Sequence, residues 1–209
     1  MKKGYKIPRY AYLYIGIVLV MQFITYYSPM LFKVTATHSP SPFNIDAHIP
    51  CIPGFVFIYV AAFVLWIAAY VYFIIRDKAL GRRVVVTDVL CKIVCIACFY
   101  LYPCTLEQPE VLTGFGAWAL KIVYACDEPM NLLPSMHCYM SWLCIRPLLS
   151  GMTPEIKRPY RIALYIFAVL ICASTLFTKQ HLFLDAVTGV LLTEVMWFLS
   201  GLMLKNRAV

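Results

Sequence analysis

The sequence predicts an all-α, polytopic membrane protein whose six transmembrane helices form a bundle with both termini in the cytoplasm. Three observations predict this class. Of the 209 residues 62% are hydrophobic, only 13% are charged, and the apolar residues form long runs between short polar segments. Few soluble domains have such a composition, whereas a bilayer requires helices of about 20 apolar residues. The length suits a single domain, residues 1–209.

Six apolar runs account for the six predicted helices. They cover residues 10–32, 55–75, 84–103, 135–152, 162–177 and 182–204. The first run follows a basic segment but lacks a small-residue cleavage site, so we expect it to be retained as a span. A further stretch, 114–126, has an apolar stripe and is predicted to form a short helix in the membrane interface.

The basic residues predict the orientation. Most of the 18 Lys and Arg residues fall in four segments, 1–9, 76–83, 153–161 and 205–209. Short basic segments next to spans lie in the cytoplasm by the positive-inside rule. The net charge of +8 is therefore explained by membrane topology, and no nucleic-acid partner is expected.

One polar stretch, Ser174 to Asp185, interrupts apolar sequence. It contains Lys179, His181 and Asp185. Charged groups beside hydrocarbon are costly and mostly mark function. If a helix begins near Leu182, His181 and Asp185 share one of its faces, so the carboxylate can orient the imidazole as a nucleophile or base. The alternative interpretation is that both residues simply cap a helix at the water boundary.

A second polar stretch, Asn131 to His137, favours the functional interpretation. Pro134-Ser135 predicts the start of a helix with Ser135 as its N-cap. His137 then lies in the first turn, where free N–H groups and the helix dipole favour an anion such as phosphate. Two such histidines suit a two-step phosphoryl transfer, in which one attacks phosphorus and the other protonates the leaving oxygen.

At these residues the sequence resembles the type 2 phosphatidic acid phosphatase superfamily. Its three signatures are usually written K-x6-R-P, P-S-G-H and S-R-x5-H-x3-D. The resemblance covers about residues 40–200, with the motif-bearing core at about 104–204. The three motifs appear here as Lys121 with Glu128-Pro129, as Pro134-Ser135-Met136-His137, and as Ser174-Thr175 with His181 and Asp185. Glutamate and threonine thus replace the two arginines of the family.

The resemblance implies a lipid phosphate or diphosphate phosphatase that acts at the extracytoplasmic face of the membrane. His181, oriented by Asp185, would form a phosphohistidine, and His137 would act as the acid and then as the base. A branch similar to inositol phosphorylceramide synthases further implies supporting roles for Asp127 and Asn131. We expect the phosphate to be held by Lys179, Lys121, Ser135 and Thr175. No cofactor and no metal are expected, since the sequence has no carboxylate cluster for Mg²⁺.

Two other functions are compatible with the same residues. The phosphoryl-headgroup could pass to a lipid or sugar hydroxyl instead of water. The missing arginines would also suit a non-catalytic lipid-binding membrane protein. The lipid itself and the oligomeric state are not predicted.

Two residue pairings are further expectations. A disulfide between Cys104 and Cys126 can form if these residues lie in an oxidising compartment, and the sequence does not decide this. Glu194 is predicted to pair with Lys92 or Arg146, since each unpaired charge at the bilayer centre costs about 2.5–3.5 kcal/mol.

Overall fold

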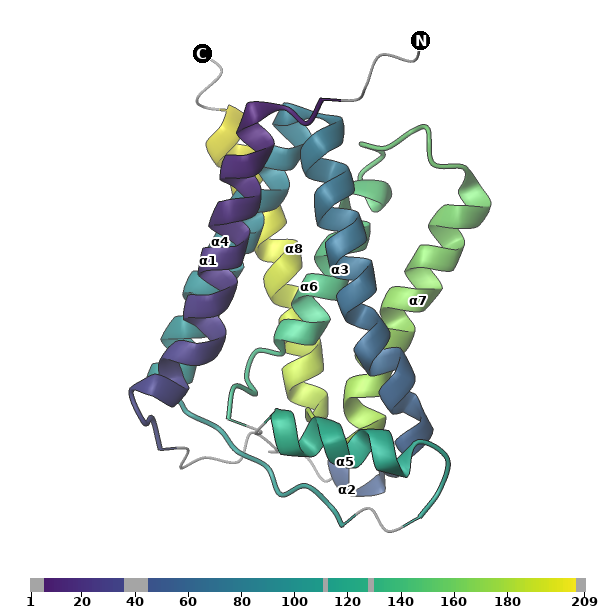
Figure 1. The fold of residues 1–209 in the computed structure, drawn as a ribbon. Helices are drawn as coiled ribbons and strands as arrows, with labels where there is room; N and C mark the ends of the chain where they lie inside the picture. The colour runs from purple at the N-terminus through teal and green to yellow at the C-terminus, as the bar shows by residue number, and fades with distance from the viewer. Residues whose placement is uncertain (1–5, 36–44, 111–112, 128–129, 206–209) are drawn as a thin grey trace.

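The computed structural model describes residues 6–35, 45–110, 113–127 and 130–205, and all regular structure in these segments is helical, as the sequence predicts (Figure 1). A single 3₁₀ turn, η1, covers Pro53–Phe55. The α-helices are α1 Arg9–Leu31, α2 Ile45–His48, α3 Val56–Arg76, α4 Lys78–Leu101, α5 Ala117–Cys126, α6 Met136–Leu149, α7 Arg158–Phe177 and α8 Phe183–Lys205.

Five of these helices, α1, α3, α4, α7 and α8, are long and apolar enough to cross a membrane. The predicted fourth span is different. Helix α6 has 14 residues and is about 21 Å long, against about 30 Å for a bilayer core. Its helical path ends at Leu149, and Gly151 then turns with a φ of 69°. The predicted count of six spans is therefore not confirmed.

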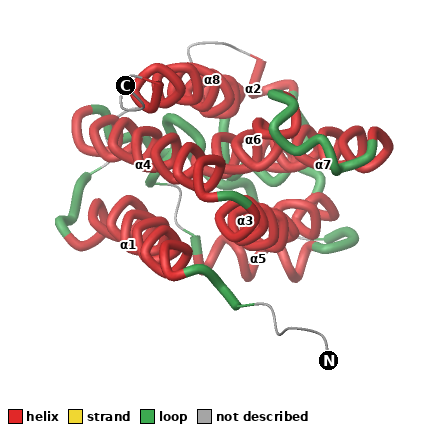
Figure 2. Tube along the Cα trace, turned by 90° about the horizontal axis from the view of Figure 1, so that it is seen from above, coloured by secondary structure: helices red, strands yellow, loops and turns green. Residues whose placement is uncertain are grey.

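Helix α6 lies inside the bundle and is its central element. It packs against α3, α4, α7 and α8, and most of its side chains are buried. Seen along the bundle, α1 lies at the edge, beside α4 (Figure 2). Helix α1 begins and α8 ends at the same end of the bundle (Figure 1). The second motif, which begins α6, is therefore surrounded by these four helices.

Helix α5 lies across the opposite end of the bundle, as Figure 1 shows. It corresponds to the predicted interfacial helix at 114–126. Its inner face packs Leu120 and Ala117 on Val56 at the start of α3. Trp118 and Ile122 are exposed, as expected for side chains that enter the membrane interface.

Two pairs of opposite charge lie within the apolar helices. Asp88 and Lys92 are fully buried and lie 2.8 Å apart, and Asp88 also accepts a hydrogen bond from Tyr70. Glu194 pairs with Arg146 at 2.9 Å. The prediction that Glu194 pairs with one of two cations is confirmed, with Arg146 as the partner.

Candidate active site

The loop between α7 and α8 places His181. Its tight turn is held by the Thr175 carbonyl, which accepts hydrogen bonds from the backbone N–H groups of Gln180 and His181 at 3.0 and 3.1 Å. Lys179 takes the left-handed conformation that this turn requires, with a φ of 53°. This turn consequently fixes the position of His181, which is only 7% exposed.

Asp185 lies in the first turn of α8, fully buried beside His181. Its Oδ2 accepts the backbone N–H of Leu182 at 2.9 Å and lies 3.5 Å from His181 Nδ1. The second distance is longer than an ordinary hydrogen bond, so the contact acts mainly through charge. Burial lowers the pKa of His181, but Asp185 foremost, together with Cys138 and Asp127, raises this pKa, and the net shift is upward.

The second motif begins α6, as the sequence predicts. Ser135 is the N-cap, and its Oγ accepts the backbone N–H of Cys138 at 3.3 Å. The Ser135 N–H donates in turn to the Asp185 carbonyl at 3.0 Å. This backbone hydrogen bond joins the start of α6 directly to the first turn of α8, and therefore joins the two motifs.

Gly189 makes this approach possible. A Cβ atom at this position would lie only 2.6 Å from the Ser135 carbonyl oxygen. Atoms that close overlap, so a larger residue would push α8 away from α6. Gly189 is one turn beyond Asp185 and so sets the separation of the two motifs.

His137 sits in a cage of aromatic rings. It stacks on Tyr59 with ring centroids 4.1 Å apart, and it meets the ring of Trp66 at 4.9 Å and that of Phe63 at 5.9 Å. The ring centroids of His137 and His181 are 6.1 Å apart. The structure thus brings together two imidazoles that are far apart in the sequence.

Asp127 and Asn131 connect the helices around this cage. Asp127 directly follows α5 and accepts hydrogen bonds from the hydroxyls of Tyr26 and Tyr59, at 2.5 and 2.8 Å. The Asn131 amide donates to the Tyr26 carbonyl at 3.0 Å. Because Tyr59 stacks on His137, its hydrogen bond to Asp127 links Asp127 to the histidine through one side chain.

Both histidines line one cavity of about 510 Å³ between α1, α3, α5 and α6. Its walls are mostly apolar and aromatic. Phe23 on α1 and Val60 and Phe63 on α3 line the cavity and are also about half exposed. The cavity therefore extends from the imidazoles to the outer surface of two apolar helices.

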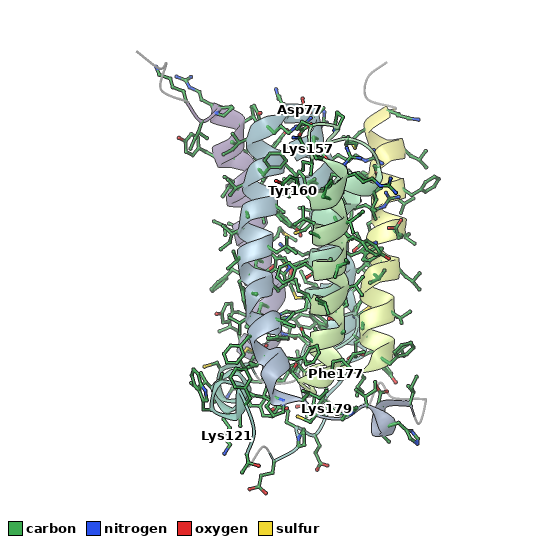
Figure 3. All side chains as sticks on the ribbon, turned by 90° about the vertical axis from the view of Figure 1, so that its right-hand side faces the viewer. Asp77, Lys121, Lys157, Tyr160, Phe177 and Lys179 are labelled. Atoms are coloured by element: carbon green, nitrogen blue, oxygen red, sulfur yellow. The ribbon has the colours of Figure 1, made fainter. Side chains whose placement is uncertain are left out.

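None of the four predicted phosphate-binding side chains lines the cavity, and the Ser135 hydroxyl is buried as the N-cap of α6. Lys121 is exposed on α5, and the Lys179 ammonium donates to the Asp46 carbonyl at 2.9 Å. Figure 3 shows both lysines at the end of the bundle that carries Phe177. Neither lines the cavity, and the Thr175 hydroxyl is buried on the Cys172 carbonyl at 2.8 Å. Glu128 and Pro129 of the first motif lie outside the described residues.

Sequence reasoning missed Gln180 and the aromatic cage. Gln180 is 3% exposed, lines the cavity next to His181, and has its Oε1 within 3.4 Å of the Gln108 amide. Its buried Nε2 has no partner among the described residues. Its place inside the motif stretch was a usable signal. Nothing in the apolar run of α3 distinguishes Tyr59 from other membrane tyrosines.

Neither a metal site nor a disulfide is found in the described part of the chain. No group of three or more His, Cys, Asp or Glu side chains could hold a metal ion there. Cys104 is buried and Cys126 is exposed, and both are free thiols. The disulfide that the sequence left open is therefore not formed in this structure.

Comparison with known proteins identifies the family. The family model described as the PAP2 superfamily, that of the type 2 phosphatidic acid phosphatases, matches residues 37–199, which include both histidine motifs. Neither a curated protein nor a solved structure matches the chain. With its five apolar helices, the match indicates an integral membrane protein of the phosphoryl-transfer class. The chain belongs to the PAP2 superfamily.

Proposed function

We propose that the protein is a lipid phosphate or diphosphate phosphatase that works at the extracytoplasmic face through a phosphohistidine. One observation carries the proposal. His137 and His181, with ring centroids 6.1 Å apart, line a single cavity whose walls reach the outer surface of apolar helices. Family membership supports phosphoryl transfer in general, and the cavity supports a lipid as the substrate.

His181 is the proposed nucleophile and His137 the proposed acid. Because His181 Nδ1 faces Asp185, Nε2 is the atom left to attack phosphorus. As the N–P bond forms, the bond from phosphorus to the lipid oxygen breaks, and His137 gives its proton to that oxygen. Water then attacks the phosphohistidine while His137 accepts its proton, which releases phosphate and restores both imidazoles.

The cavity supplies neutral donors for the phosphoryl oxygens. Met136 and His137 begin α6 and line the cavity, and their backbone N–H groups have no acceptors within the helix, whereas the Cys138 N–H donates to Ser135 Oγ. The unpartnered Nε2 of Gln180 is a further donor beside His181. Lys179 could reach the phosphate only by leaving the Asp46 carbonyl, and the proposed role of Lys121 requires a movement of α5 or its side chain.

The lipid tail has a route into the cavity between α1 and α3. Phe23, Val60 and Phe63 line the cavity and also face outward, so an alkyl or prenyl chain can pass between them without crossing a polar barrier. The volume of about 510 Å³ exceeds what a phosphate group fills. We infer that the first part of the hydrocarbon chain is bound together with the headgroup.

A phosphate-release assay on purified protein tests the proposal. Phosphatidate, phosphatidylglycerol phosphate and a polyprenyl diphosphate form the substrate panel. His181→Ala should abolish turnover, and His137→Ala should reduce kcat by about 10²–10⁴-fold. The control is His48→Ala, which removes an exposed histidine of α2 that does not line the cavity. Full activity of His181→Ala on a lipid that the wild type hydrolyses would refute the assignment.

Transfer to an alcohol is the second candidate, and the size of the cavity favours it. Space beyond the phosphate could hold an acceptor hydroxyl in place of water. Adding diacylglycerol or inositol to the assay distinguishes the two reactions. Phosphate release without any acceptor supports hydrolysis, whereas product formation only with the alcohol supports transfer.

A further inference from the structure

A second cavity lies at the other end of the bundle. It has a volume of about 1060 Å³ and opens between the start of α4, the end of α6 and the last turns of α8. Figure 3 shows Asp77, which lines it, at the end opposite Lys179. Five basic side chains line this cavity: Lys78, Arg82, Arg83, Arg146 and Lys205.

The acidic side chains of this cavity do not balance its cations. Asp77 accepts the backbone N–H of Leu80 at 2.7 Å and so caps α4. Glu194 accepts hydrogen bonds from Arg146 at 2.9 Å and from Trp142 at 2.7 Å. Within the described residues, Arg83 and the other three cations have no carboxylate at ion-pair distance. The cavity therefore carries an excess of positive charge.

Arg83 and Arg146 converge on one indole ring. The guanidinium carbon of Arg83 lies 4.1 Å from the Trp197 ring centroid, and that of Arg146 lies 5.8 Å from it. Arg83 Nη2 donates to the Trp197 carbonyl at 3.2 Å, while its buried Nε has no acceptor among the described residues. Two cations on one ring repel each other, and a shared anion would offset this cost.

The backbone of α8 makes room for Arg83. A Cβ atom at Gly201 would lie 2.8 Å from Arg83 Nη2. The guanidinium thus sits against α8 because this position has no side chain. An inward guanidinium with a free buried N–H, held by a carbonyl and an indole face, has the features of an anion site rather than of a solvated surface arginine.

The rest of the cavity wall is apolar and faces outward. Phe198 is 64% exposed and Leu202 is 45% exposed, and both line the cavity on α8. A ligand that satisfies both parts of the wall has an anionic head and a hydrocarbon tail. Soluble phosphate would leave the apolar part uncovered.

We propose that this cavity binds the headgroup of an anionic phospholipid, with the phosphate at Arg83 and the acyl chains along Phe198 and Leu202. The bound lipid joins α4, α6 and α8 at the end of the bundle opposite the histidines. This site is separate from the proposed active site, and the inference does not depend on the proposed function.

Lipid binding to the detergent-purified, delipidated full chain tests the proposal. Native mass spectrometry and thermal unfolding are measured with phosphatidylglycerol, with phosphatidylcholine and with glycerol phosphate alone. Phosphatidylglycerol should bind and raise the unfolding temperature more than phosphatidylcholine does. Arg83→Gln should weaken phosphatidylglycerol binding by at least about tenfold, the effect of a lost charge-assisted hydrogen bond.

Arg158→Gln is the matched control, since Arg158 is an exposed arginine that begins α7 and does not line the cavity. This variant should bind phosphatidylglycerol as the wild type does. Three results would overturn the proposal: equal binding by wild type and Arg83→Gln, equal effects of the two lipids, or an equal effect of glycerol phosphate alone. If Arg83→Gln does not fold, Arg82→Gln on the exposed rim decides, with weaker binding in support and unchanged binding against.

Discussion

The ring of Tyr59 lies face to face with the imidazole of His137, with centroids 4.1 Å apart and planes inclined by 20°. The hydroxyl group of the same tyrosine donates a hydrogen bond to Asp127 at 2.8 Å. The orientation of His137 is therefore set by α3 and by the end of α5, which both lie outside its own motif. Removing this support should affect catalysis without touching either histidine.

Substitution of Tyr59 separates the role of the ring from that of the hydroxyl. Tyr59→Leu removes the stack, which is worth about 0.5–1.5 kcal/mol, so we expect kcat to fall by about two- to tenfold or more. Tyr59→Phe keeps the ring and should retain more activity. Steady-state kinetics on the same lipid phosphate checks this order. Equal kcat values for wild type and Tyr59→Leu would show that the stack does not position His137.

Gly189→Ala should separate the two motifs. Its Cβ would lie 2.6 Å from the Ser135 carbonyl, so α6 and α8 must shift apart. Overpacking of this kind costs about 1–3 kcal/mol, and we expect a lower unfolding temperature together with a loss of activity. Gly16→Ala is the control, because nothing lies within 4 Å of a Cβ there. That variant should be neutral or slightly more stable, and equal behaviour of the two would contradict the close contact.

The pH dependence should report the effect of Asp185 on His181. The proposed nucleophile must be neutral, so activity rises as the pH increases through the pKa of His181. Asp185 raises this pKa, and Asp185→Asn leaves burial to lower it. The rising limb of kcat/KM against pH should therefore move to lower pH in Asp185→Asn, while the plateau falls. A limb at the same pH in both proteins would count against the pairing.

Loss of the buried ion pair within α4 should destabilise the protein more than loss of the pair between α6 and α8. Asp88→Asn leaves the fully buried Lys92 without its carboxylate, which typically costs about 3–5 kcal/mol. Glu194→Gln removes a pair that is partly exposed, so its effect should be about 1 kcal/mol or less. Thermal unfolding in detergent measures both. The double variant Asp88→Asn with Lys92→Met should regain stability if an unpaired charge is the cause of the loss.

Local sequence features predicted the ends of the helices at the site. Pro134-Ser135 marks the start of α6 because serine caps a helix, and the basic segments mark where apolar helices end. The four-residue spacing of His181 and Asp185 predicted that they lie close together. They do, because α8 begins only two residues after His181. These features depend on neighbours in the chain, which a sequence shows directly.

Features that depend on distant neighbours could not be predicted in the same way. The run 135–152 is apolar throughout most of its length, yet α6 ends at Leu149 and packs as a short central helix. The contact of Gly189 with Ser135 and the stack of Tyr59 on His137 join segments more than 50 residues apart. The two lysines were expected to replace the missing motif arginines. In the structure neither lysine lines the cavity, and the Lys179 ammonium donates to a backbone carbonyl.

The central claim is that His137 and His181 act on one phosphoryl group, and the most direct measurement is to trap the intermediate. Wild type, His137→Ala and His181→Ala are mixed briefly with ³²P-labelled lipid phosphate, quenched in base, digested and mapped by mass spectrometry. The account predicts an acid-labile label on His181 in the wild type, a longer-lived label in His137→Ala because water is no longer activated, and none in His181→Ala. Turnover by the wild type with no label on His181, or with the label on another residue, would contradict it.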